Sequence, residues 1–118
     1  MSTSKLQVEQ IIAYLSERGE TISVAESLTA GGLANALTSA SGSSAVFVGG
    51  LTAYRNEIKS TMLDVDPQII SDFTVVSEEV ANAMADGARK VFGTTWAIAT
   101  TGAAGPDPLE GHAPGSVW

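Results

Sequence analysis

The spacing of apolar residues changes several times along this chain, and this alternation constrains the fold more than any other feature. Residues 4–18 carry apolar side chains at helical spacing, whereas the β-branched run at 21–25 alternates as a strand does. The same succession then repeats, with helices expected at 29–40, 56–63, from 67 and from 77, and strands expected at 45–54, 94–100 and 115–118. Helices that alternate with strands predict an α/β fold with helices on both faces of a sheet.

Composition narrows the class of protein. A length of 118 residues suits one domain, so residues 1–118 are expected to form a single unit. Six basic against 13 acidic residues give a net charge of −7, so no basic surface for nucleic acid is expected. The absence of cysteine and the single histidine argue against a zinc site. No run approaches the roughly 20 apolar residues of a membrane span, and the N-terminus lacks a signal peptide, so a cytoplasmic protein is expected.

Ligands of α/β folds bind beyond the carboxyl ends of the strands. The segments that leave the expected strand ends are 26–32, 54–59 and 101–106, and all three are polar or rich in glycine. These segments are therefore the places to look for a site that binds a small molecule.

The first segment includes Glu26, Ser27, Thr29 and Gly31 and opens a helix. Free N–H groups at such a turn favour an anion such as a phosphate. The chain from Ser27 to Asn56 contains no acidic residue, which suits an anion site. The alternative is a plain strand-to-helix turn capped by Thr29.

The second and third segments offer other chemistry. Ser43 and Ser44 could supply a nucleophile if Lys59 acted as its base, with Tyr54 hydrogen-bonded to either group. Alternatively, both serines are turn residues and Lys59 is a solvated helix cation. The loop that follows Thr101 could form an oxyanion hole, or it could simply connect two strands.

Three further residues are expected to be structural. We expect His112 to be a solvated loop residue, and Trp96 and Trp118 to pack in the core or against the sheet. The chain stops inside an apparent strand with no closing helix, so we expect a domain that is incomplete at its C-terminus.

Four stretches in register match a known family: VAESLTAGGL, GSSAVFVGGLTAYRNEIK, VVSEEVANAMADGAR and ATTGAAGPD with PGSVW. From about residue 5 to residue 118, the chain resembles the C-terminal domain of the competence/damage-inducible protein CinA. That domain also occurs alone as a nicotinamide-nucleotide amidohydrolase. The resemblance implies a three-layer α/β/α sandwich, here lacking its C-terminal strands and helix.

The resemblance also implies an activity. It implies hydrolysis of the carboxamide of nicotinamide mononucleotide to nicotinic acid mononucleotide and ammonia, in pyridine-nucleotide salvage and without a metal or cofactor. By this resemblance Ser44 is the expected nucleophile and Lys59 its base, with Tyr54 orienting the lysine. Ser27 and Thr101 would bind substrate or shape the oxyanion site, and Ser27 is the alternative nucleophile. The remaining residues expected to contact substrate are Glu26, Thr29, Gly31, Asn56, Gly102 and Gly105.

Ala30 departs from the family, which commonly has glycine there. It is tolerable in a helical conformation and costly if φ is positive. Two other hypotheses stay open. One is a non-catalytic module that binds a nucleotide or a partner. The other is a chain that folds only by pairing its open sheet edge, and a homo-oligomer is also plausible.

Overall fold

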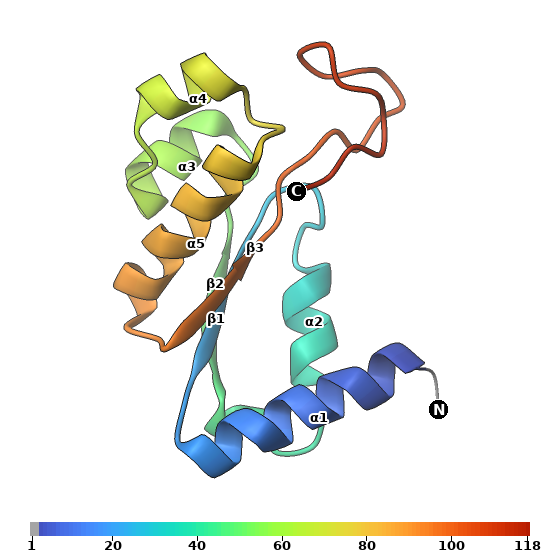
Figure 1. Cartoon of the computed structure of the whole chain (residues 1–118), viewed down its shortest axis with the longest axis vertical. Helices are drawn as coiled ribbons and strands as arrows, with labels where there is room; N and C mark the ends of the chain where they lie inside the picture. The colour runs from blue at the N-terminus through green and yellow to red at the C-terminus, as the bar shows by residue number, and fades with distance from the viewer. Residues whose placement is uncertain (1–2) are drawn as a thin grey trace.

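A three-stranded parallel sheet forms the centre of the computed structural model, which describes residues 3–118 (Figure 1). The strands are β1 (Ile22–Glu26), β2 (Phe47–Thr52) and β3 (Trp96–Ala99), in the order β2-β1-β3. They confirm the strands expected at 21–25, 45–54 and 94–100. Because β1 lies between the other two, the residues that follow it are next to the residues that follow both neighbours.

Helices cover both faces of the sheet, as the alternating pattern predicts (Figure 1). The helices α1 (Thr3–Arg18) and α2 (Gly32–Thr38) lie on one face. The helices α3 (Asn56–Leu63), α4 (Pro67–Phe73) and α5 (Glu78–Phe92) lie on the other. A 3₁₀ turn, η1 (Ser43–Ala45), leads into β2. The expected three-layer α/β/α arrangement is confirmed.

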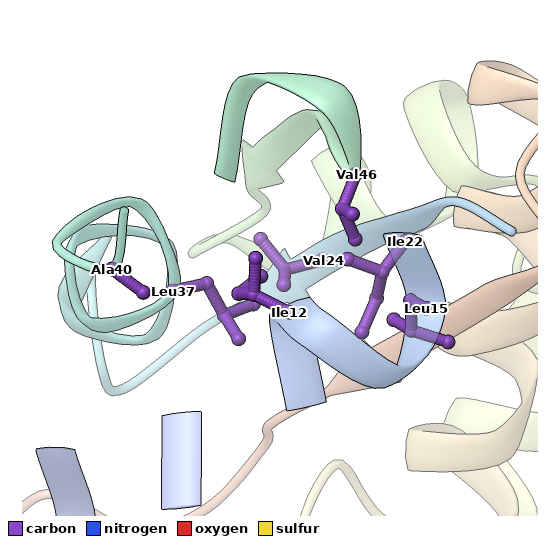
Figure 2. Close-up of a cluster of buried hydrophobic side chains, with 7 residues drawn as sticks. All are labelled: Ile12, Leu15, Ile22, Val24, Leu37, Ala40 and Val46. Carbon is purple, nitrogen blue, oxygen red and sulfur yellow. The ribbon is translucent and has the colours of Figure 1, made fainter. Parts of the chain in front are cut away.

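Each face of the sheet has its own hydrophobic core. Under α1 and α2, seven buried side chains pack together: Ile12, Leu15, Ile22, Val24, Leu37, Ala40 and Val46 (Figure 2). Under α3 and α5 the buried cluster is Ala25, Ala53, Leu63, Val65, Val80, Met84 and Ala88. Both clusters use residues of β1, which explains why that strand is buried along its whole length.

The expectations at the end of the sheet are partly wrong. Residues 115–118 form a single antiparallel bridge, Gly102 to Val117, instead of a strand. Trp96 and Trp118 are not core residues, since they are 50% and 55% exposed. Trp96 lies on the edge strand, and its indole N–H donates to Glu20 Oε2 at 2.8 Å. Within residues 3–118, no helix has the length and apolar character needed to cross a membrane.

Local sequence signals account for the starts of α4 and α5. Asp66 accepts a hydrogen bond from the N–H of Gln68 before α4, and Ser77 accepts one from Val80 at the start of α5. By contrast, α2 begins at Gly32, three residues after the predicted start. Ala30 and Gly31 have φ of 50° and 99°, a left-handed turn that helical periodicity does not reveal.

Three glycines allow neighbouring strands and helices to approach closely. A Cβ on Gly49 would lie 2.8 Å from the Phe92 ring, and a Cβ on Gly50 would lie 2.5 Å from the Val24 side chain. The pairing of β2 with β1 also skips one residue at this point, which is the signature of a β-bulge. In α5, a Cβ on Gly87 would lie 2.0 Å from the Leu63 carbonyl oxygen, and this contact joins α5 to the end of α3.

Candidate active site

A cavity of about 430 Å³ opens at the carboxyl ends of the strands. The segments that follow β1, β2 and β3 all contribute to its wall, as the topology predicts. Seven of the candidate site residues named above line it: Ser27, Tyr54, Asn56, Lys59, Thr101, Gly102 and Gly105. Its size falls within the roughly 300–1,000 Å³ typical of small-molecule sites.

Lys59 and Ser27 form the centre of this cavity. The Lys59 amine donates to Ser27 Oγ at 3.1 Å and to the backbone carbonyl of Tyr54 at 2.9 Å. Lys59 is 1% exposed and Ser27 is 7% exposed, so this pair is shielded from solvent. Helix α3 supplies the lysine, and the turn after β1 supplies the serine. A buried hydroxyl within hydrogen-bond distance of a buried amine is the arrangement that a Ser/Lys nucleophile requires.

The electrostatics of Lys59 favour a base. Burial lowers the pKa of its amine below the ordinary value of 10.5, because the charged form loses its hydration. The negative charges of Glu110 and Glu57 act in the opposite direction but do not cancel this effect. A lowered pKa increases the neutral fraction of the amine, which is the form that can accept the serine proton.

The expected pairing of Ser44 with Lys59 is wrong. Ser44 lies in η1, which enters β2 at its amino end, whereas Lys59 follows the carboxyl end of the same strand. Ser44 is exposed and does not line the cavity. The amino and carboxyl ends of a strand lie at opposite ends of the sheet, so Ser44 is far from Lys59. The serine that reaches Lys59 is Ser27, the alternative nucleophile.

Glu26 does not face a substrate. Its buried carboxylate accepts hydrogen bonds from the Thr29 hydroxyl at 2.6 Å and from the N–H groups of Leu33 and Ala34 at 2.8 and 3.0 Å. Burial alone would raise the pKa of this carboxyl group, but these bonds and one from the Gly31 N–H hold it below its ordinary value. The side chain therefore caps the start of α2.

This cap corrects the expectation of an anion site at the first turn. The N–H groups at the start of α2 already bind the chain's own carboxylate. Thr29 is also engaged, with its hydroxyl 2.7 Å from that of Thr100 as well as bonded to Glu26. Neither Thr29 nor Gly31 lines the cavity, so their expected contact with substrate is not supported.

Tyr54 and Asn56 lie at the mouth of the cavity. Tyr54 orients Lys59 through its backbone carbonyl, while its side chain is 61% exposed. Asn56 begins α3 and lines the cavity beside it. The contact of Tyr54 with Lys59 is therefore made by its main chain.

Thr101 has a structural partner. Its buried hydroxyl donates to the Val75 carbonyl at 2.6 Å, which ties the end of β3 to the connection between α4 and α5. Gly102 packs against the returning chain, since a Cβ there would lie 2.4 Å from the Ser116 carbonyl oxygen. At Gly105 a Cβ would lie 2.9 Å from the ring of Pro114, so both glycines shape the loop that forms one wall.

Sequence reasoning missed the contacts that hold this loop. The Val75 N–H donates to Glu110 Oε2 at 3.2 Å, and Thr74 Oγ1 lies 3.0 Å from His112 Nε2. His112 is therefore a half-buried partner of Thr74, not a solvated residue. Arg55, Val75, Asp107 and Glu110 also line the cavity. Of these, Glu110 alone lies outside the matched stretches, in a loop of proline, glycine and acids that has no periodicity to indicate a role.

A metal centre finds no support in residues 3–118, where no group of three or more histidine, aspartate or glutamate side chains could hold an ion.

Comparison with known proteins agrees with this architecture. The family model of the CinA C-terminal domain matches residues 4–118. A CinA-like protein from Parasynechococcus marenigrum is 51% identical over 96 residues, which are 81% of this chain and 23% of the relative. A CinA-like protein from Synechocystis is 54% identical over 94 residues, 80% of this chain and 23% of the relative. The chain thus spans about a quarter of the length of these relatives.

Solved structures show the same fold. The competence/damage inducible protein CihA from Agrobacterium tumefaciens superposes with a TM-score of 0.93 at 36% identity, covering 99% of this chain and 72% of that one. A CinA superfamily protein from Enterobacter cloacae gives 0.95 at 30% identity, covering 99% and 70%. With the matched family model, these likenesses place the chain in the CinA C-terminal domain family.

Proposed function

We propose that this chain is an amidohydrolase domain that deamidates nicotinamide mononucleotide, with Ser27 as nucleophile and Lys59 as base. The observation that carries the proposal is the 3.1 Å hydrogen bond between two buried groups inside the cavity. The resemblance of the chain to nicotinamide-nucleotide amidohydrolases supports the choice of substrate. The names of the matched relatives state membership of the family and no reaction.

The proposed reaction has two halves. Neutral Lys59 takes the proton of Ser27 as Oγ attacks the carboxamide carbon, which forms a tetrahedral intermediate. The protonated lysine then gives this proton to the leaving nitrogen, ammonia departs, and an acyl-serine ester remains. Water attacks the ester with Lys59 again as base, and the proton returns to Ser27 as nicotinic acid mononucleotide leaves.

The developing oxyanion needs hydrogen-bond donors. Leu28, which directly follows Ser27, and Gly102 both line the cavity, so their backbone N–H groups are the candidate donors. Thr101 is the less suitable donor, because its hydroxyl proton already goes to Val75.

Ammonia release from nicotinamide mononucleotide tests the proposal. We expect turnover by the parent, and a loss on the order of 10⁴-fold or more in both Ser27→Ala and Lys59→Met. Ser44→Ala is the matched control, because it removes the other candidate serine from the far edge of the sheet, and it should retain parental activity.

Two outcomes would count against this assignment. Full activity in Ser27→Ala would reject the nucleophile. Nucleotide binding by a folded parent without ammonia release would favour the non-catalytic binding module. Circular dichroism of each variant establishes that the comparison is between folded proteins.

A further inference from the structure

The wall of the cavity carries both basic and acidic side chains. Four charged side chains line it: Arg55, Lys59, Asp107 and Glu110. Arg55 is itself paired, with its Nε 2.8 Å from Glu57 Oε1. In the proposed mechanism Lys59 is neutral when it acts as a base. At that moment the two acids of the wall outnumber the cations, so the reactive cavity favours a positively charged ligand.

Of the two acids on the cavity wall, Glu110 is the one whose charge acts on Lys59. The Val75 N–H holds its carboxylate at 3.2 Å, which fixes the side chain on the cavity wall. Burial is the largest influence on the pKa of Lys59, and the charge of Glu110 is the strongest influence opposing it. Since the lysine amine lies 3.1 Å from Ser27 Oγ, the field of Glu110 reaches the place where the carboxamide must bind.

For Ser27 to attack the carboxamide, the ring of the substrate must lie within the electrostatic field of Glu110. A carboxamide carbon must come within about 3–3.5 Å of Ser27 Oγ to react, and its ring is bonded directly to that carbon. A ring that carries a positive charge is therefore attracted by Glu110. A neutral ring of the same shape gains nothing from this charge.

We propose that Glu110 is a specificity-determining residue that selects carboxamides on a positively charged, N1-substituted pyridinium ring over neutral rings of the same shape. Asp107, on the same loop, adds to this preference at longer range. The inference rests on the proposed function, because it assumes that the carboxamide reacts at Ser27.

The test compares two mononucleotides of equal shape. Nicotinamide mononucleotide has a cationic ring, and benzamide riboside 5′-monophosphate has a neutral ring with carbon in place of N1. Ammonia release gives kcat/KM for each, and titration calorimetry gives each Kd. Glu110→Gln removes the charge but keeps an oxygen that can accept from Val75. Asp86→Asn, an acid of α5 outside the cavity, is the matched control.

We expect the parent and Asp86→Asn to prefer the cationic mononucleotide. In Glu110→Gln the cationic-to-neutral ratio should fall about tenfold, in kcat/KM and in affinity alike. A ratio unchanged by Glu110→Gln, with turnover intact, would overturn this inference and leave the proposed function standing. Binding without turnover of either compound would reject the proposed function, and the two Kd values would still decide the charge preference. Absence of binding would reject both.

Discussion

The buried amine of Lys59 makes the stability of this fold depend on pH in a specific way. In the unfolded chain the amine has its ordinary pKa of 10.5, and burial lowers that pKa in the folded state. Between the two values the unfolded chain binds a proton that the folded chain does not. The free energy of unfolding therefore rises with pH in this window, with a slope approaching about 1.4 kcal/mol per pH unit for one proton at 25 °C.

The slope disappears outside the window. Below the folded pKa both states carry the proton, and above 10.5 both are neutral. The contribution of Lys59 to stability is therefore lowest below its folded pKa and increases as the pH rises from there toward 10.5.

Lys59→Met isolates this effect, because methionine has a similar volume and no proton to lose. At neutral pH the variant avoids the cost of burying an amine, but it loses hydrogen bonds to Ser27 and Tyr54 worth about 1 kcal/mol each. We expect it to be about as stable as the parent there. As the pH rises toward 10, the free energy of unfolding of the parent should increase relative to that of the variant.

Urea unfolding of both proteins at several values between pH 7 and pH 10 measures the difference. All other ionisable groups are common to both chains, so their contributions cancel in the difference. A parent-minus-variant difference that stays constant across the range would refute the reasoning, because it would mean that Lys59 has the same pKa folded and unfolded.

Three further substitutions test other features of the fold, each by urea unfolding. Ala30→Gly should stabilise the chain by about 0.5–1 kcal/mol, because φ of 50° strains a residue with a Cβ; a loss of stability would contradict the left-handed turn. Gly87→Ala should destabilise by about 3 kcal/mol, since its Cβ would meet the Leu63 carbonyl oxygen at 2.0 Å, and an unchanged stability would show that α3 and α5 can separate freely. Glu26→Gln should lose stability at neutral pH, and the parent's advantage should shrink as the pH falls below 4.5, because the lowered pKa of Glu26 stabilises the fold only while the group is ionised. A difference independent of pH would contradict that assignment.

Local signals in the sequence were sufficient for most of the fold. Asp66 followed by Pro67, and Ser77 followed by two glutamates, mark helix starts through hydrogen bonds made within one turn. The small residues of the 78–92 helix predict close packing, and Gly87 provides it against α3. These features depend on neighbours in sequence or on residue size, so they can be read before the structure is known.

The site was only partly predictable, because its pairs come from different strands. The sequence identified Lys59 and both candidate serines but chose Ser44. Strand direction could have corrected that choice, since Ser44 precedes a strand and Ser27 follows one. Residues at opposite ends of parallel strands cannot meet.

Other parts of the site depend on tertiary contacts that sequence spacing does not encode. The role of Glu26 depends on a left-handed turn at Ala30 and Gly31, which brings the start of α2 back onto the carboxylate. The contacts of Glu110 and His112 join loops more than 30 residues apart in sequence.

The cap formed by Glu26 has a consequence for how the domain meets its ligand. A turn whose amide groups bind a phosphate becomes ordered only when the phosphate binds. The free-energy cost of ordering the turn then weakens binding. Here the carboxylate supplies that negative charge permanently, so the turn that holds Ser27 is set during folding. Ser27, the proposed nucleophile, is thus preorganised before any ligand binds, and in the proposed reaction the entropy of fixing it would not be lost again at each turnover.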